Sequence, residues 1–415
     1  MTASLNVWWD NRRVGVLSID RHGDAEFTYA QSWREAPGAR AISVSLPLQT
    51  ETFSRRQCRP FFEGLLPEES QRIAVAAALG ISQQNEFRLL EAIGGEIAGA
   101  LSLWPKDVTP PETTWDSPAE KLSDEAVVAL LDRLPARPLL AGEGGLRLSL
   151  AGAQAKVPLI ATSDGLALPR PGEPTTHILK PPIARFSDTT ENEAFAMRLA
   201  QKIGLEVAEV EIRTVSGRSF LLIKRYDRTA NADGKTRRLH QEDFCQAMGY
   251  TSAQKYAADG GPVFRDCFAL LRRAATRPAV EVLKMMDAAL FNLIIGNADA
   301  HGKNYSLLYH ADAIVMAPLY DLLSTVAYPD LSPNLAMKIA RHARLEDLFS
   351  RDWTKFAEET GLTEPYIRRR AASLAGQIIA QAPQSRASFD ASFHRAMQAF
   401  EDLVVARAGT LKAAL

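Results

Sequence analysis

The segment Gly296-Asn297-Ala298-Asp299-Ala300-His301-Gly302-Lys303-Asn304 is the most informative part of this chain. An apolar run over 279–295 precedes it and predicts a long buried helix. Two short strand-like runs, 305–309 and 313–317, follow it, and the segment after them ends in Tyr320-Asp321. The expected local structure is a buried helix, a polar loop and a hairpin, with a further aspartate beyond the hairpin.

The spacing of three polar side chains in this region is typical of phosphoryl transfer. Asp299 and Asn304 have four residues between them, and Asp321 follows the expected hairpin. Protein kinases use this layout for a catalytic-loop aspartate and two oxygen ligands of Mg²⁺. Asp, Asn, Gly and His are also common in ordinary turns, because they tolerate unusual backbone angles. An ordinary turn has no need of a second aspartate beyond a hairpin, so the kinase layout is the preferred interpretation.

Composition sets the broad class of protein. At 415 residues the chain is long enough for two or more domains, and its 46% hydrophobic and 23% charged content is that of an ordinary soluble globular protein. No run reaches the length of a membrane span, and residues 1–10 lack a secretory signal. The three cysteines have no metal-binding spacing, which fits a reducing cytoplasm. A formal charge of −1 gives no general attraction to nucleic acid or membranes.

The first hundred residues predict a small α+β domain, 1–104. An alternation at 42–46 predicts a further strand, and a helix is expected near 69–78. Residues 105–122 contain four prolines and many polar residues, so they are the best candidate for a linker. Short β-branched or aromatic runs predict an antiparallel meander over 5–9, 14–19 and 25–30.

The next region contains a break rich in small residues. After a short helix at 123–134, alternating leucines predict a strand at 146–150, and strand character returns at 157–160. Between them, Ala151-Gly152-Ala153 removes side-chain bulk, which lets main-chain N–H groups approach a phosphate. The pattern is neither a GxGxxG nor a Walker loop, so on the residues alone a plain tight hairpin is the preferred interpretation and a phosphate-binding loop is the alternative.

The elements that follow have the order of a kinase N-lobe, in which a strand lysine pairs with ATP phosphates and a helix glutamate. A strand at 176–180 ends on Lys180, and a helix at 191–204 carries Glu191 and Glu193. Beyond these we expect a hairpin of strands at 207–215 and 220–226, followed by a crossover at 224–228 and a polar loop at 231–238. A helix capped by residues 240–243 comes next. The closing helices are expected over 352–408, with breaks at Gly361 and Pro383.

Taken together, these motifs resemble those of the HipA toxin kinases of bacterial type II toxin–antitoxin modules, almost from end to end. Several separate motifs in the right order are far more specific than any one of them. The matching segments are Ile42-Ser43-Val44-Ser45-Leu46-Pro47, Phe61-Phe62-Glu63-Gly64-Leu65-Leu66-Pro67, Ser149-Leu150-Ala151-Gly152-Ala153-Gln154-Ala155-Lys156, Thr176-His177-Ile178-Leu179-Lys180, Lys224-Arg225-Tyr226-Asp227-Arg228, His240-Gln241-Glu242-Asp243, Gly296–Asn304 and Leu319-Tyr320-Asp321.

The resemblance implies an α+β, protein-kinase-like two-lobe fold with an added N-terminal α+β domain and a largely helical C-lobe. The expected divisions are 1–104, the linker 105–122, an N-lobe-like region 123–230 and the helical C-lobe 231–415. It also implies a serine/threonine-protein kinase that uses ATP and Mg²⁺. Asp299 looks like the catalytic base, and Asn304 and Asp321 look like the Mg²⁺ ligands. The ATP-binding residues implied by the resemblance are Ala151, Gly152, Ala153, Gln154, Ala155, Lys156, Lys180, Lys224, Arg225, Tyr226, Asp227, His301, Gly302, Lys303, Asn304, Tyr320 and Asp321.

Regulation is implied in the same way. Ser149 stands where family members autophosphorylate, a modification that switches the enzyme off. A phosphate adds a charge of about −1.5 to −2, which beside this loop would repel the nucleotide. The chain departs from the family at Ala155, which replaces an acidic residue, and at Lys224, which stands where a glutamate can occur. Neither departure removes a metal ligand or the base.

The resemblance also implies partners. Family members phosphorylate aminoacyl-tRNA synthetases, typically glutamyl-tRNA synthetase, and so halt translation. A HipB-like helix-turn-helix antitoxin neutralises them. We expect that antitoxin to be dimeric, giving a heterotetramer that binds operator DNA, and we expect a cytoplasmic protein with no membrane partner.

Three other functions stay open. A small-molecule phosphotransferase shares the Asp-x₄-Asn layout, and a non-catalytic corepressor subunit would share the family's assembly. A metal-dependent hydrolase using Asp299 and His301 would need further ligands, which no other segment supplies convincingly.

Overall fold

The structure is a computed structural model that describes residues 3–111, 119–162, 165–230 and 235–415. The chain divides into two compact units, each assembled from separate stretches. The first unit consists of Met1–Pro181, Arg213–Ser252 and Leu308–His310. The second unit consists of Pro182–Ile212, Ala253–Leu307 and Ala311–Leu415.

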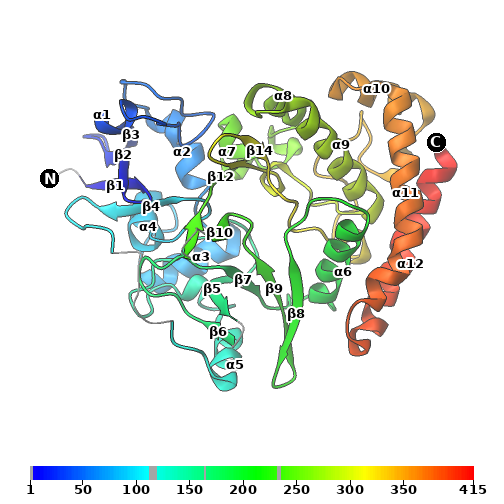
Figure 1. The fold of residues 1–415 in the computed structure, drawn as a ribbon, viewed down its shortest axis with the longest axis horizontal. Helices are drawn as coiled ribbons and strands as arrows, with labels where there is room; N and C mark the ends of the chain where they lie inside the picture. The colour runs from blue at the N-terminus through cyan, green and yellow to red at the C-terminus, as the bar shows by residue number, and fades with distance from the viewer. Residues whose placement is uncertain (1–2, 112–118, 163–164, 231–234) are drawn as a thin grey trace. The chain divides into compact units, whose positions relative to one another are not determined.

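The N-terminal part of the first unit is a four-stranded antiparallel sheet (Figure 1). Leu17 pairs with Phe27 and Val7 with Leu103, and all four side chains are buried on the core side. The predicted meander is therefore confirmed. The sheet has the order β3-β2-β1-β4, with β1 at Ser4–Trp9, β2 at Arg12–Ile19, β3 at Ala25–Tyr29 and β4 at Leu101–Pro105.

The strand predicted at 42–46 is wrong. Ser43 and Leu46 form an isolated bridge, and the main-chain N–H of Ser45 donates to Ser43 Oγ at 3.0 Å. The serine hydroxyl thus competes for a main-chain group and turns the segment, which a reading of hydrophobic alternation does not anticipate.

Short helices complete the first unit. Helix α2 packs against β3, and Ser54 and Gln57 form a capping box at its start. The helix predicted near 69–78 is confirmed as α3, and that at 123–134 as α5. The helices are α1 at Gln31–Arg34, α2 at Arg55–Glu63, α3 at Glu69–Leu79, α4 at Glu86–Ile93, α5 at Asp124–Arg133 and α7 at Phe244–Met248.

A second sheet of the first unit has the strand order β6-β5-β7-β9-β8. Its inner strands share a buried core, in which Leu179 pairs with both Val157 and Leu222. Residues 213–215 are the part of β8 that belongs to this unit. The strands are β5 at Val157–Thr162, β6 at Gly165–Ala167, β7 at His177–Lys180, β8 at Val210–Val215 and β9 at Arg218–Lys224.

The strand predicted at 146–150 is wrong, because only Leu148 is paired, in a parallel bridge with Glu96. Residues 112–118 of the predicted linker and 231–234 of the predicted polar loop lie outside the described residues. The loop prediction is wrong over its described end, where β11 (Thr236–Arg238) is a strand that pairs with β10 (Arg228–Ala230); β12 (His240–Asp243) follows.

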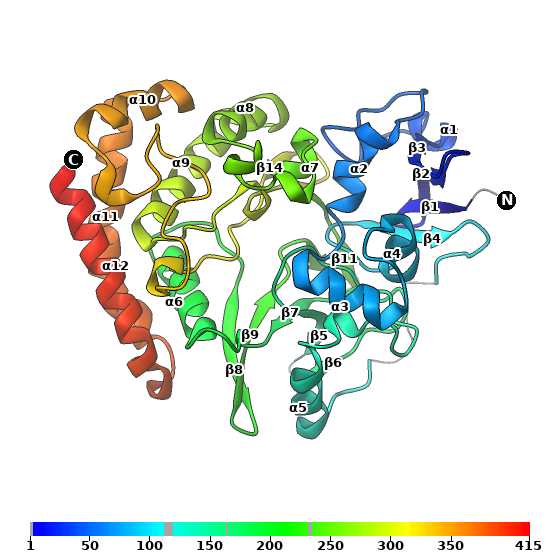
Figure 2. The same cartoon turned by 180° about the vertical axis from the view of Figure 1, so that it is seen from behind.

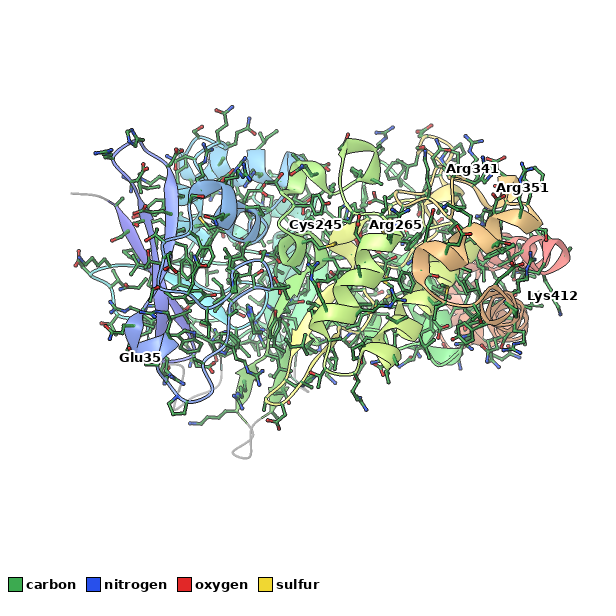
Figure 3. The ribbon with its side chains drawn as sticks, turned by 90° about the horizontal axis from the view of Figure 1, so that it is seen from above. Glu35, Cys245, Arg265, Arg341, Arg351 and Lys412 are labelled. Carbon is green, nitrogen blue, oxygen red and sulfur yellow. The ribbon has the colours of Figure 1, made fainter. Side chains whose placement is uncertain are left out.

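The second unit is mostly helical. Helices α11 and α12 lie side by side (Figure 2). Most residues of α9 are buried. Arg265 of α8, Arg351 of α10 and Lys412 of α12, which are labelled in Figure 3, are exposed residues. The helices are α6 at Thr189–Lys202, α8 at Phe264–Ala274, α9 at Pro278–Ile295, α10 at Ser350–Thr360, α11 at Glu364–Ala387 and α12 at His394–Ala414.

The predicted break at Gly361 is confirmed, since this residue ends α10 with a left-handed φ of 66°. The predicted break at Pro383 is wrong, because α11 continues to Ala387. A proline removes one helical hydrogen bond, but burial of Ala382 and Ser385 holds the last turn in place. No helix in the described part of the chain is long and apolar enough to cross a bilayer.

Candidate active site

Helix α9 ends at a glycine that the site requires. Gly296 has a left-handed φ of 73°, and its N–H caps the helix at the carbonyl of Asn292. A Cβ at this position would lie 2.3 Å from Cγ2 of Val326. Any other residue would meet both backbone strain and a steric clash, so the polar loop starts at a fixed point and in a fixed direction.

Hydrogen bonds hold the loop from beneath. The Ala298 N–H donates to Thr325 Oγ1 at 2.7 Å, and that hydroxyl donates to the Gly296 carbonyl at 3.2 Å. The buried amide of Asn297 donates to Asn292 Oδ1 at 2.9 Å. Because these partners lie on the interior side, the loop presents the side chain of Asp299 to solvent, where the residue is exposed.

Asp299 is held by neighbours in the same unit. Its main-chain carbonyl accepts the N–H of His301 at 2.8 Å. Its carboxylate oxygen Oδ1 accepts the phenolic O–H of Tyr256 at 2.8 Å. Tyr256 was not anticipated from the sequence, because a single tyrosine 43 residues upstream carries no spacing signal.

The structure brings Asn304 and Asp321 together. Nδ2 of Asn304 donates to Oδ2 of Asp321 at 3.1 Å, and Oδ1 of Asn304 accepts the His301 N–H at 3.2 Å. Asp321 has a φ of 59°, in the left-handed region. For a residue other than glycine this conformation costs on the order of 1–3 kcal/mol, and such strain is concentrated at functional sites.

This pair of side chains fits Mg²⁺. Carboxylate and amide oxygens are hard ligands, and each amide oxygen has a second lone pair. The described residues contain no group of three or more His, Cys, Asp or Glu side chains placed to hold a metal ion. A site with two protein ligands is typical of Mg²⁺ that takes its remaining ligands from phosphate and water.

Further contacts fix the segment that carries Asp321. Tyr320 Oη donates to the Lys303 carbonyl at 2.7 Å, so this predicted ATP-binding residue stabilises the backbone of the loop 296–304. Asn192 of α6 exchanges two hydrogen bonds with the main chain of Ser324, at 3.0 and 2.9 Å. Helix α6 is therefore tied directly to the segment that follows Asp321.

In the first unit, the loop 151–156 is held in a tight turn. Gly152 has a φ of 113°, and a Cβ there would lie 2.4 Å from Nζ of Lys156. That ammonium donates to the Ala151 carbonyl at 2.7 Å, and Gln154 Nε2 donates to the Pro181 carbonyl at 3.2 Å. The loop is closed by its own lysine in this structure.

The predicted hinge at 224–227 is the end of β9 and the turn after it. The Arg225 N–H already donates to the Thr176 carbonyl at 2.9 Å, so an adenine edge would have to meet other main-chain groups. The side chains of Arg225 and Asp227 are buried and paired with each other at 2.9 and 2.8 Å. Their side chains therefore support the hinge rather than face a ligand.

That pair belongs to a buried ionic cluster that sequence reasoning missed. Its other members are Glu96, Arg228 and Arg238, with contacts to Glu96 of 2.7 Å from Arg228 and 2.6 Å from Arg238. Burial alone would raise the pKa of Glu96, but the surrounding guanidinium groups hold it well below its usual range. The same balance lowers the pKa of Asp227 to about 2.

Ser149 is completely buried in this structure. Its hydroxyl donates to the Leu65 carbonyl at 2.7 Å, and its N–H donates to the Glu96 carbonyl at 2.9 Å. A phosphate has no room in this environment, so modification of Ser149 requires the segment to leave its place.

The predicted site residues thus fall into two sets. Asp299, His301, Gly302, Lys303, Asn304, Tyr320 and Asp321 lie together in the second unit. The residues 151–156, Lys180 and 224–227 lie in the first unit, where Lys180 is a buried residue at the end of β7. Convergence of both sets on one nucleotide stays a prediction.

Comparison with known families gives two matches. A model described as the HipA N-terminal domain matches residues 5–104. A model described as the HipA-like C-terminal domain matches residues 148–385.

Curated relatives and a solved structure agree with these matches. The chain is 58% identical over 372 residues to a putative kinase, Y4mE, of Sinorhizobium fredii, with 89% of each chain covered. It is 30% identical to the serine/threonine-protein kinase toxin HipA of Shewanella oneidensis, with 94% of each covered. A solved complex of HipA, HipB and operator DNA from Shewanella oneidensis has a TM-score of 0.85 and 27% identity, and it covers 97% of this chain and 96% of that chain. The predicted fold class is confirmed.

Proposed function

This chain belongs to the HipA family of serine/threonine-protein kinases, and on that premise we propose that it is the toxin of a toxin–antitoxin module. We propose further that it transfers the γ-phosphate of Mg-ATP to a protein hydroxyl. The observation that carries this proposal is the contact between Asn304 and Asp321, on the same loop and hairpin as the exposed Asp299. A pair of metal-binding oxygens beside an exposed carboxylate is what a phosphoryl-transfer site needs.

Each residue has a role in this proposal. Asp299 accepts the proton of the acceptor hydroxyl and aims that oxygen at the phosphorus. Asn304 and Asp321 would hold Mg²⁺, which when bound neutralises charge on the phosphates. In the first unit, Lys180 and the main chain of 151–156 supply positive charge and N–H donors for phosphate oxygens, and the main chain of 224–227 receives the adenine.

The direct test is transfer of ³²P from γ-labelled Mg-ATP to the chain itself and to proteins of a bacterial extract. We expect Asp299→Asn to slow transfer by about a hundredfold or more, the usual contribution of a general base. Asp312→Asn is the matched control, because Asp312 is an exposed aspartate in the same hairpin. Equal transfer by wild type and Asp299→Asn would remove Asp299 from its role. Transfer to aminoglycosides or sugars, and to no protein, would favour the small-molecule phosphotransferase instead.

The protein substrate we propose is an aminoacyl-tRNA synthetase of the glutamyl type, and the support is the family resemblance alone. Phosphoproteomics of a host that expresses the wild type or Asp299→Asn tests this proposal. A synthetase phosphopeptide that depends on Asp299 is the expected result, and its absence among otherwise Asp299-dependent sites would contradict it.

We also propose a HipB-like antitoxin and operator DNA as partners. The support is the solved complex of the Shewanella oneidensis protein, in which HipA is assembled with HipB and operator DNA. The expected result is co-purification with a small helix-turn-helix protein encoded beside this chain, and retention of the operator by the pair. A chain that arrests growth only in the absence of that protein would support the toxin assignment.

A further inference from the structure

Tyr256 makes a contact that the residue roles proposed above do not include. Its phenolic oxygen lies 2.8 Å from Oδ1 of Asp299. We propose that Tyr256 is a positioning residue for Asp299, which fixes the direction of the carboxylate by binding one of its two oxygens. This inference rests on the proposed function, since it assigns a partner to the proposed base.

The backbone around Tyr256 is built as a rigid support. The Tyr256 carbonyl accepts the N–H groups of both Asp259 and Gly261, each at 3.0 Å. A Cβ on Gly261 would lie 1.9 Å from the Gln254 carbonyl oxygen, so only glycine allows this close approach. Two short 3₁₀ turns, Ser252–Gln254 and Ala257–Asp259, flank the tyrosine. These contacts therefore hold the backbone of Tyr256 in a fixed conformation.

The aromatic ring is also fixed. The His301 ring meets it edge to face at a centroid distance of 5.0 Å and an angle of 74°. The ammonium of Lys255, a buried residue, lies 5.2 Å from the ring centroid. The titratable residues in contact with this tyrosine therefore include Asp299, His301 and Lys255. Two of these stand on the catalytic loop itself, so the ring and the loop position each other.

This arrangement has a chemical consequence for phosphoryl transfer. A carboxylate whose Oδ1 is held by a phenol presents its second oxygen in one defined direction. The donated hydrogen bond also stabilises the anionic form of Asp299, which is the form that accepts a proton. A misaligned base loses much of its effect, because efficiency depends on near-attack geometry. A mobile gate over the base would need a flexible backbone. The main-chain carbonyl of Tyr256 accepts two hydrogen bonds, so the backbone at this residue is held in place.

The contact itself is tested without any activity assay. The full chain is labelled with 3-fluorotyrosine, and the ¹⁹F line of Tyr256 is assigned by its loss in Tyr256→Phe. We expect Asp299→Asn to lower the midpoint at which that line titrates, because a neighbouring carboxylate opposes ionisation of a phenol. The line of Tyr366 is the internal control, since its carboxylate neighbour is Asp287, and it should not move. An unchanged Tyr256 line would overturn the inference.

The role is tested by Tyr256→Phe, which keeps the ring and removes only the hydroxyl. We expect kcat for phosphate transfer from Mg-ATP to fall about tenfold to a hundredfold, the factor that a hydrogen bond to a charged group contributes. The KM for ATP should stay within about twofold, and the acid limb of the kcat–pH profile should move to higher pH.

The outcomes separate the two proposals. An active chain whose Tyr256→Phe variant keeps its kcat and its pH profile would overturn this inference alone. A rise in kcat would identify Tyr256 as an inhibitory cover over Asp299, which also overturns it. A third outcome is a wild-type chain that transfers no phosphate, although Asp299→Asn still shifts the Tyr256 line. This would overturn the proposed function. The contact between Tyr256 and Asp299 would then be present without a catalytic role.

Discussion

Asn304 donates its amide hydrogen to Oδ2 of Asp321 at 3.1 Å across 17 residues of sequence. The two residues are adjacent because a hairpin of β13 (Ser306–Tyr309) and β14 (Ile314–Met316) returns the chain to the loop. A parallel bridge between Val207 and Leu319 then fixes the segment just before Asp321. The position of the pair is thus set by main-chain pairing.

The left-handed backbone of Asp321 gives the first prediction. Asparagine tolerates a positive φ at least as well as aspartate, so Asp321→Asn should keep the free energy of unfolding within about 0.5 kcal/mol of wild type. The loss of a charged ligand should nevertheless reduce phosphate transfer by about a hundredfold or more. Urea unfolding and transfer from Mg-ATP measure the two effects. A large loss of stability would show that Asp321 serves the fold rather than the metal.

Glu242 gives a prediction about pH. Burial raises the pKa of this carboxyl to about 7, despite hydrogen bonds from Ser43 Oγ and Tyr309 Oη, each at 2.5 Å. A folded pKa above the unfolded value means that the stabilising contribution is complete below pH ~4.5 and is lost as pH rises toward 7. The loss should approach about 3 kcal/mol, because each unit of pKa shift is worth ~1.4 kcal/mol.

Glu242→Gln should therefore flatten the stability–pH curve between pH ~4.5 and ~7. Thermal unfolding across this range measures it. Glu35→Gln is the matched control, since Glu35 is exposed at the surface of the same unit (Figure 3). A wild-type curve that rises with pH over this interval, relative to Glu242→Gln, would contradict the assignment.

The loop that carries Asp299 was predictable because its signals are local. The apolar run before Gly296, the Asp-x₄-Asn spacing and the two strand runs 305–309 and 313–317 lie within about forty residues, and periodicity and turn chemistry describe them well. The predicted helix at 279–295 and both strands are present as α9, β13 and β14.

The residues that sequence reasoning missed depend on distant contacts. Glu96 meets Arg225, Arg228 and Arg238 across 129 to 142 residues, and Tyr256 meets Asp299 across 43. No spacing rule connects such pairs. The strand predicted at 146–150 failed for a related reason: Ser149 uses its N–H and hydroxyl on Glu96 and Leu65, so this segment pairs with a loop instead of a sheet.

The buried cluster around Glu96 gives a prediction about stability. Glu96→Gln leaves three arginines with one carboxylate fewer, and loss of one partner from a buried ion pair costs about 3–5 kcal/mol. Glu86→Gln removes a partly exposed pair with Arg59 and should cost under about 1 kcal/mol. Urea unfolding of both variants gives the comparison, and equal costs would contradict the argument.

The same cluster should make the first unit sensitive to acid. The pKa of Asp227 is lowered to about 2, so its stabilising contribution is present above pH ~4 and is lost as pH falls toward 2. Glu96, whose pKa is also lowered, acts in the same direction. We expect wild type to lose stability steeply below pH ~4, and Asp227→Asn to lose less over that interval because its contribution is already absent.

Ser149 gives the last prediction, which concerns regulation. Ser149→Ala removes the donor to the Leu65 carbonyl and leaves a buried acceptor unpaired, at a cost of about 1–3 kcal/mol. Ser149→Glu adds a charge that this buried position cannot accept, so the segment 146–156 should leave its place. Because residues 151–156 are proposed to meet ATP phosphates, Ser149→Glu should weaken ATP binding at least tenfold, whereas Ser149→Ala should change it by less than about threefold.

Ser82→Glu is the control for added charge, since Ser82 is exposed in the same unit. Binding of a fluorescent ATP analogue measures all three variants, and limited proteolysis should cut only Ser149→Glu within 146–156. If Ser149→Glu bound the analogue as tightly as wild type, the phosphate at Ser149 would have to act by some means other than displacing this loop.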